Sequence, residues 1–93
     1  MRERDLQHAV MTGAAWLGWL CIHQFDSRRS QPGFPDCLCV RDGRVVALEF
    51  KTEKGRVRPE QQAWLDALSQ VPGVVARVVR PADLDEIIEE VLR

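Results

Sequence analysis

The fold is decided by residues 37–51, CLCVRDGRVVALEFK. Two β-prone runs flank Asp42-Gly43, and this dipeptide between apolar residues is one of the strongest short-range signals for a two-residue β-hairpin. The sequence therefore predicts antiparallel strands over 37–41 and 44–51. The second strand is apolar until Glu49 and Lys51 place two charges near its end, and those charges need a physical reason.

The register of this hairpin brings two carboxylates face to face. With the turn at Asp-Gly, Arg41 pairs with Arg44, and pairing outward from there places Asp36 opposite Glu49. Opposed side chains in an antiparallel pair have Cβ atoms about 5 Å apart, where like charges are destabilising. Lys51 lies two residues beyond Glu49 and therefore on the same face. We expect a cation between the carboxylates, and Mg²⁺ is the natural candidate because it binds carboxylates, water and substrate phosphate.

A simpler interpretation has to be set against a metal site. Glu49 and Lys51 could form an exposed ion pair on a solvated sheet, worth at most about 1 kcal/mol, with Asp36 capping the start of its strand. The tripeptide Glu-x-Lys alone favours this interpretation because it is common. The position of Asp36 in the register favours a site, in which Lys51 holds or orients an attacking water and offsets charge developing on phosphate.

The rest of the chain predicts a small mixed sheet flanked by helices. Apolar residues at helical spacing predict a helix over 3–17, and Pro59 and Pro81 stand where helix N-termini accept proline. Branched and aromatic residues predict strands over 19–25 and 74–79, and the second of these suits a strand covered on both faces. The predicted order is α-β-β-β-α-β-α, which is an α/β domain.

Chain length and charge limit the classes of function. A chain of 93 residues fits one domain, 1–93, because it is too short to support a second core. Its net charge of -1 lacks the signature of a nucleic-acid binder. However, residues 28–58 carry eight basic and four acidic side chains, whereas residues 83–93 carry five carboxylates and one Arg. A segment able to face phosphate is thus masked in the total charge.

Cysteine content and hydropathy indicate an intracellular protein. The three cysteines, Cys21, Cys37 and Cys39, are odd in number, and no signal peptide precedes them, which fits a reduced, cytoplasmic protein. No apolar run approaches the roughly 20 residues that span a bilayer, so no membrane association is expected. Cys37-x-Cys39 with His23 lacks the paired spacing of a zinc site, and we expect both cysteines in the core.

The motifs form a more specific combination than any of them does alone. They are, in chain order, GFPD (33–36), the Asp-Gly hairpin, ALEFK (47–51), a basic loop with a glycine, and PEQQAWL (59–65). Their order and spacing resemble a stand-alone VRR-NUC domain of the PD-(D/E)xK nuclease superfamily, of a type found in phages and bacteria. The similarity runs from Glu3 to the last predicted strand.

This resemblance implies a restriction-endonuclease-like core and a Mg²⁺- or Mn²⁺-dependent DNA endonuclease, similar to Holliday-junction resolvases. It also implies a homodimer that acts on branched or duplex DNA, without an organic cofactor, in a bacterial or phage-infected cell. By position, Asp36 and Glu49 match metal ligands, assisted by the backbone carbonyl of Phe50, and Lys51 matches the catalytic lysine.

Two further positions match the family pattern. Gln61 matches a glutamine that the family places beside the active site from the helix after the hairpin. Glu3 matches a glutamate of the N-terminal helix that completes the metal shell directly or through water. Cys37 and Cys39 stand where aliphatic residues are more usual, but no catalytic position is lost.

Residues of two loops are candidate phosphate contacts. Basic side chains beside a hydrolytic site would fix the register of DNA without reading its sequence. A solvated loop is the alternative, and for a single arginine it is about equally probable. The candidates are Arg28, Arg29 and Ser30 in one loop, and Lys54, Arg56 and Arg58 in the other.

Two other functions remain open at this point. One is a nucleic-acid-binding or scaffold protein that keeps the nuclease fold without hydrolysis, although the intact set of acidic and basic residues disfavours it. The other is an interaction module whose acidic C-terminal helix mimics DNA. For Trp16, Trp19 and Trp64, packing is a better interpretation than stacking on bases.

Overall fold

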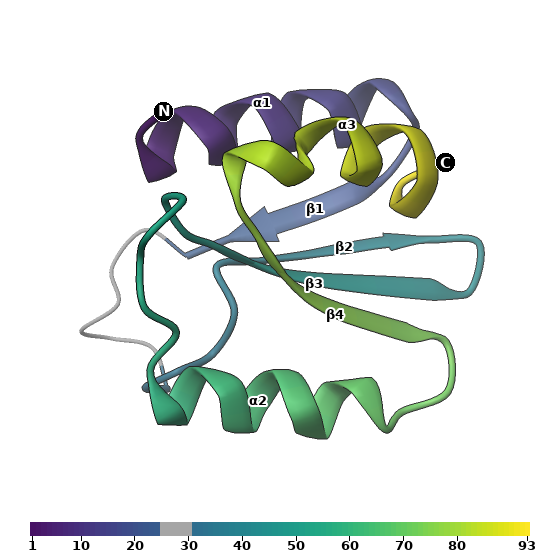
Figure 1. The fold of residues 1–93 in the computed structure, drawn as a ribbon. Helices are drawn as coiled ribbons and strands as arrows, with labels where there is room; N and C mark the ends of the chain where they lie inside the picture. Colours follow the sequence, from purple (N-terminus) through teal and green to yellow (C-terminus); the bar gives the residue numbers. More distant parts are fainter. Residues whose placement is uncertain (25–30) are drawn as a thin grey trace.

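The computed structural model describes residues 1–24 and 31–93. A four-stranded sheet lies between helices (Figure 1). The elements, in chain order, are α1 (Glu3–Trp16), β1 (Leu20–His23), β2 (Cys37–Arg41), β3 (Arg44–Phe50), α2 (Pro59–Ser69), β4 (Val74–Val79) and a C-terminal helical segment made of η1 (Pro81–Asp83), α3 (Leu84–Glu86) and η2 (Ile87–Val91). The predicted order of elements is confirmed.

The hairpin has the predicted register. Arg41 pairs with Arg44, and the ladder runs to Cys37 opposite Leu48. Asp42 and Gly43 have φ values of 51° and 77°, so both turn residues are left-handed. A type I′ turn needs this conformation at both positions, and glycine and aspartate tolerate it better than most residues.

The sheet is mixed, with strand order β1-β2-β3-β4. The pairs β1/β2 and β2/β3 are antiparallel, whereas β4 runs parallel to β3. The parallel pair requires a crossover, and α2 supplies it. Both β1 and β4 are edge strands, and β3 pairs with β2 over Arg44–Leu48 and with β4 over Val45–Phe50.

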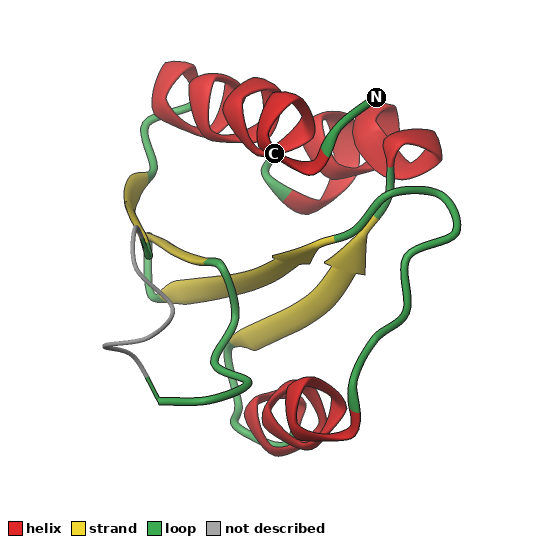
Figure 2. Ribbon diagram, turned by 90° about the vertical axis from the view of Figure 1, so that its left-hand side faces the viewer, coloured by secondary structure: helices red, strands yellow, loops and turns green. Residues whose placement is uncertain are grey.

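Helices cover both faces of the sheet, as Figure 2 shows. The helix α1 and the C-terminal helical segment lie together on one face, and α2 lies on the other (Figure 1). The main core is on the α1 side, where Leu6 and Val10 of α1 pack with Leu48, Phe50 and buried neighbours. Alternation along β3 therefore sends Glu49 to the opposite face, toward α2.

Several details differ from the sequence-based predictions. The first strand begins at Leu20 rather than Trp19, because the Trp19 side chain turns into the core and donates its indole N–H to the Leu92 carbonyl at 2.8 Å. Trp16 is 86% exposed, so its predicted packing was wrong. The prediction that both faces of β4 are covered was also wrong in part, because Val75 is 43% exposed at the sheet edge.

The C-terminal helical segment is less regular than the sequence predicts. It begins at Pro81 as a 3-10 turn, continues as a single α-helical turn and ends as a π-helical turn. The expected apolar side is present, since Ile87 and Leu92 are fully buried. Within the described part of the chain, no helix has the length and apolar character needed to cross a bilayer.

Candidate active site

Two carboxylates lie at the open end of the β2/β3 hairpin. The ladder ends at Cys37 and Leu48, so Asp36 and Glu49 occupy the next opposed positions. The Asp36 Oδ2 atom accepts a hydrogen bond from the Phe50 N–H at 2.8 Å. This bond anchors the carboxylate of Asp36 to the end of β3, beside the side chain of Glu49.

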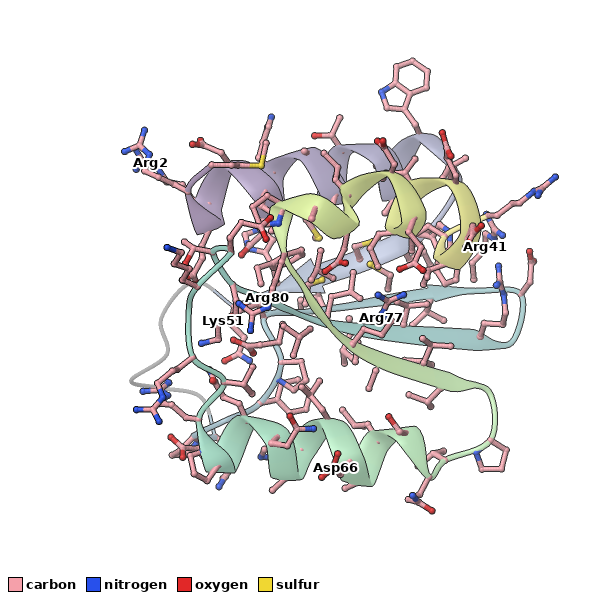
Figure 3. The ribbon with its side chains drawn as sticks, viewed as in Figure 1. Arg2, Arg41, Lys51, Asp66, Arg77 and Arg80 are labelled. Atoms are coloured by element: carbon pink, nitrogen blue, oxygen red, sulfur yellow. The ribbon has the colours of Figure 1, made fainter. Side chains whose placement is uncertain are left out.

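Glu49 is a buried acid with mostly polar neighbours. Its residue is only 3% exposed. Its Oε2 atom accepts a hydrogen bond from Gln61 Nε2 at 3.0 Å and lies 3.8 Å from Lys51 Nζ. The Lys51 side chain is itself only 12% exposed, and Figure 3 shows it at the end of β3, on the side of the sheet that faces α2. The exposed ion pair considered from sequence is therefore wrong for Glu49 and Lys51.

The first turn of α2 fixes the orientation of Gln61. Its Oε1 atom accepts the Arg58 N–H at 2.9 Å, which satisfies a backbone donor at the helix N-terminus. With the oxygen committed to the backbone, the amide nitrogen is directed to Glu49. Gln61 is 5% exposed. The glutamine thus holds the carboxylate of Glu49 through a rigid helix end.

Burial and charge make the ionised form of Glu49 unfavourable. Burial, the neighbouring Asp36 carboxylate and a hydrogen bond with it raise the pKa of Glu49 from 4.5 to about 8, although Lys51 acts in the opposite direction. Glu3 adds a small rise to the same pKa. Near neutral pH, the protonated form of Glu49 is therefore favoured in the absence of a bound cation.

The Gly-Phe-Pro-Asp loop is fastened on two sides. A Cβ at Gly33, whose φ is 85°, would lie 2.5 Å from the Glu60 carbonyl oxygen of α2, so this close approach requires glycine. The ring of Phe34 meets Trp64 of α2 edge to face, with centroids 5.0 Å apart. Gln24 donates its side-chain N–H to the Pro35 carbonyl at 2.7 Å.

A cavity of about 350 Å³ opens beside the two carboxylates. Its wall combines the acidic pair with Gln61, the Gly-Phe-Pro-Asp loop and the first turn of α2. Such a space has room for a phosphate group and its water, but it is too small to enclose a nucleic acid strand.

The comparisons with known proteins agree with this geometry. A family model described as the VRR-NUC domain matches residues 3–82, which is most of the chain. The chain belongs to the VRR-NUC family. A solved structure titled "VRR_NUC domain" superposes with a TM-score of 0.74 at 24% identity, covering 95% of both chains. Another, titled "VRR_NUC domain protein", has a TM-score of 0.72 at 18% identity, covering 98% of this chain and 85% of the other.

At these identities, the solved structures show the fold, and the family model shows the family. The resemblance inferred from the motifs is thereby confirmed, as is the mixed four-stranded sheet flanked by helices. The chain has a nuclease-type domain. No curated protein matches the chain.

The residues of this VRR-NUC site fit a hard divalent cation. Asp36 and Glu49 supply two carboxylates at one point, and the raised pKa of Glu49 is the response expected of a buried carboxylate beside a like charge. Mg²⁺ commonly binds one or two carboxylates and keeps several waters. No cluster of three or more Asp, Glu, His or Cys side chains suited to a metal occurs among residues 1–24 and 31–93.

The other predicted site residues lie at different distances from the acidic pair. Phe50 is the last residue of β3, with a fully buried ring and a backbone next to Asp36. Glu3 is exposed at the start of α1 and acts on Glu49 only through its charge. Its role as a metal ligand stays a prediction.

The predicted phosphate contacts divide into two groups. Lys54, Arg56 and Arg58 are exposed between β3 and α2. Arg58 also forms an ion pair with Glu60, with Nε and Oε1 3.4 Å apart. Arg28, Arg29 and Ser30 lie outside the described residues.

Sequence reasoning missed two residues that hold the site together. The side chain of Gln24 donates a hydrogen bond to the Gly-Phe-Pro-Asp loop, and the backbone N–H of Gln24 donates to the Asp36 carbonyl at 3.0 Å. Arg80 donates to the carbonyls of Thr52 at 2.6 Å and Gly55 at 2.8 Å, which shapes the loop after Lys51. Figure 3 shows Arg80 close to Lys51. Both residues act on backbone carbonyls, and such contacts leave no pattern in a sequence.

Proposed function

We propose that this VRR-NUC protein is a metal-dependent endonuclease that hydrolyses phosphodiester bonds in DNA and selects its substrate by structure. The observation that carries the proposal is the acidic pair, Asp36 and Glu49, with Lys51 and Gln61 against it. Asp36 is partly buried and Glu49 is buried, and a fold gains no stability from two opposed carboxylates held close together in this way. The arrangement is understandable if the pair binds a cation during function.

The residues of the chain have separate roles in this proposal. Asp36 and Glu49 would hold Mg²⁺ or Mn²⁺, assisted by the Phe50 carbonyl and by Glu3, directly or through water. The bound cation would neutralise charge on the scissile phosphate and favour deprotonation of a bound water. Gln61 keeps the Glu49 carboxylate in one orientation through the 3.0 Å hydrogen bond.

Lys51 acts on the water and the phosphate. Its ammonium group donates a hydrogen bond that orients the attacking water, and its charge offsets the negative charge that develops on the phosphoryl oxygens. Because the side chain is only 12% exposed, bulk water screens this charge weakly. The same burial confines the ammonium to the neighbourhood of Glu49.

The surface supports binding of DNA by more than one copy of the chain. Lys54, Arg56 and Arg58 provide exposed positive charge between β3 and α2, and Arg58 lines the cavity. Leu20 and Ile22 are 78% and 69% exposed on the face of β1 that α2 leaves open. An exposed apolar area of this kind favours association of subunits, and a two-fold dimer would address two strands or a branched junction.

A cleavage assay with a matched lysine control tests the proposal. Purified wild type, Lys51→Ala and Lys54→Ala are incubated with four-way junctions, flaps, nicked duplexes and single strands, in Mg²⁺, Mn²⁺ or chelator. We expect wild type and Lys54→Ala to cut at least one branched substrate with a metal, and Lys51→Ala to be at least about 10²-fold slower. Chelator should abolish cutting.

Two outcomes would contradict this function. Equal cutting by wild type and Lys51→Ala would show that the nuclease activity does not come from this site. Binding of branched DNA without any cutting in either metal would favour the alternative, a nucleic-acid-binding or scaffold protein with a nuclease fold. Circular dichroism of each variant establishes that the fold is intact.

A further inference from the structure

The three cysteines gather on the face of the sheet that α1 covers. Cys21 of β1 lies directly opposite Cys39 of β2, and their Sγ atoms are 2.6 Å apart. Cys37 lies two residues before Cys39 on the same face and is buried with it. The facing partner of Cys37 is His23, not a cysteine. Only one pair of thiols is thus in direct cross-strand register.

We propose that Cys21 and Cys39 form a disulfide that covalently joins β1 to β2. Directly opposed residues in antiparallel strands have Cα atoms about 4.5–5.5 Å apart, which lies within the ~4.4–6.8 Å range that a disulfide spans. The two sulfurs are 2.6 Å apart as thiols, whereas a disulfide bond is about 2.05 Å long, so bond formation requires only a small adjustment. The inference does not depend on the proposed nuclease activity.

A low-molecular-weight disulfide such as oxidised glutathione can drive this reaction. The thiolate of Cys21, which is partly exposed, attacks one glutathione sulfur and releases one reduced glutathione. Cys39 then loses its proton and attacks the Cys21 sulfur, which expels the second glutathione. The two protein thiols lose two electrons in total, and one glutathione disulfide gains them and is reduced to two thiols.

The environment of the thiols sets the rate of this exchange. Burial raises the pKa of Cys21 to about 12, and a hydrogen bond with Cys37 together with burial raises the pKa of Cys39 as well. Little thiolate is therefore available in the folded protein near neutral pH, and exchange is slow there. The disulfide should form readily while the chain folds, when the thiols are still solvated.

The disulfide should stabilise the fold without changing the candidate active site. It closes the chain from residue 21 to residue 39, and a closed loop of this size should raise Tm by on the order of 10 °C. The sulfurs are on the α1 side of the sheet, whereas Glu49 and Gln61 are on the α2 side. The oxidised and reduced forms should therefore have the same site geometry.

Refolding with redox control and mass spectrometry tests the proposal. Wild type, Cys21→Ala, Cys37→Ala and Cys39→Ala are refolded in buffers of graded oxidised to reduced glutathione, quenched with acid and alkylated in denaturant. Wild type should show one alkylated thiol and one disulfide between two cysteines. Cys37→Ala should show no alkylated thiol, because both of its cysteines are in the disulfide. Tm should fall by on the order of 10 °C after reduction of either protein.

The single-cysteine variants are necessary because trypsin does not cleave the chain between Cys37 and Cys39. Trypsin leaves Cys37 and Cys39 in one peptide, 30–41, so peptide mapping of wild type alone cannot tell which of them is joined to Cys21. Cys21→Ala and Cys39→Ala should keep two free thiols each. Three free thiols in wild type after oxidative refolding, glutathione adducts in place of the internal bond, or a disulfide in Cys39→Ala would each overturn the proposal.

Discussion

The two ends of the β2/β3 hairpin carry the same electrostatic problem and resolve it differently. At the turn end, Arg41 faces Arg44, and at the open end Asp36 stands opposite Glu49. Like charges directly opposed across strands are destabilising in both cases. The comparison separates a like-charged pair that the fold neutralises by itself from one that it does not.

Fixed groups contact both side chains of the arginine pair, although the buried Arg41 Nε atom has no hydrogen-bond partner among the described residues. Arg41 donates to the Leu17 carbonyl at 2.7 Å, and Arg44 donates to the Arg93 carbonyl at 2.6 Å. Both guanidinium groups lie over the ring of Trp19, at 4.6 Å and 4.9 Å from its centroid. Figure 3 shows Arg41 beside the C-terminal helical segment. These contacts tie the hairpin to the C-terminal end of α1 and to Arg93.

The carboxylate pair has weaker compensation. Among residues 1–24 and 31–93, Lys51 offers one ammonium group at 3.8 Å, and the other partners of the pair are the neutral N–H groups of Phe50 and Gln61. The remaining negative charge is reduced by a proton, as the raised pKa of Glu49 shows. A site that takes up a proton in this way can take up a cation instead, because both satisfy the same oxygens.

Removing one charge at the open end should produce the largest effect. We expect Asp36→Asn to reduce cleavage by on the order of 10³-fold, because an amide is a poor ligand for Mg²⁺ next to Glu49. The asparagine oxygen can still accept the Phe50 N–H, so stability should change by less than about 1 kcal/mol. Single-turnover rates and urea unfolding measure the two quantities.

An acidic residue outside the pair provides the control for this variant. Glu60→Asn removes an exposed carboxylate from the wall of the same cavity. Its cleavage rate should stay within about threefold of wild type, since surface changes of this kind have small effects. If Asp36→Asn cuts DNA as fast as Glu60→Asn, the carboxylate pair does not bind the catalytic metal.

The second prediction concerns pH and is expected to reach a few kcal/mol. The folded protein holds the Glu49 proton up to pH about 8, whereas the ordinary pKa is 4.5. The folded state thus binds more protons than the unfolded state between these values, and the free energy of unfolding falls as pH rises from 4.5 to 8. Glu49→Gln imitates the protonated form. It should be a few kcal/mol more stable than wild type at pH 8.5 and similar to wild type at pH 4.5.

Mn²⁺ should stabilise wild type but not Glu49→Gln, and so oppose this difference in stability. In chelator at pH 8.5, Glu49→Gln should have the higher Tm, and addition of Mn²⁺ should raise the Tm of wild type but not that of the variant. Guanidinium titrations at several pH values measure the stability in each condition. A wild-type stability that stays constant from pH 4.5 to 8.5 in chelator would contradict the raised pKa of Glu49.

The positions of Asp36 and Glu49 follow from the register of the hairpin, and this register can be predicted from the sequence. The Asp-Gly turn admits few backbone conformations, so the register and the opposition of Asp36 and Glu49 follow from local chemistry. Apolar spacing predicts the helix over residues 3–17 in the same way, and α1 is found over Glu3–Trp16. These features depend on residues close together in the chain.

The features that sequence reasoning missed depend on distant contacts. Gln24 and Arg80 act on carbonyl groups that the tertiary fold brings to them. Trp16 and Trp19 have similar neighbours in the sequence, yet one is exposed and the other is buried under two arginines. Their difference arises where α1 ends and the chain turns at Gly18, whose φ is 86°. Periodicity does not fix which of the two tryptophans enters the core.

At the turn end, removal of one charge should affect stability but not catalysis. Arg44→Ala loses the hydrogen bond to the Arg93 carbonyl and the contact with the Trp19 ring. Its free energy of unfolding should fall by about 1–2 kcal/mol, while the cleavage rate stays within about threefold of wild type. Urea unfolding and the junction-cleavage assay test the two parts. A large loss of cleavage with unchanged stability would break the contrast between the two ends.

The smallest effect is expected at the turn itself. Asp42 forms an ion pair with Arg41, with Oδ2 and Nε 3.3 Å apart, but its side chain is 81% exposed, so water screens the pair. Asp42→Asn keeps a residue that tolerates the φ of 51° and should change the free energy of unfolding by less than about 0.5 kcal/mol. Asp42→Val removes the same charge but places a branched side chain in the left-handed conformation, at a cost of about 1–2 kcal/mol. If both variants lose the same stability, the charge of Asp42 matters more than its left-handed backbone conformation. The turn end would then depend on ion pairing, as the open end does.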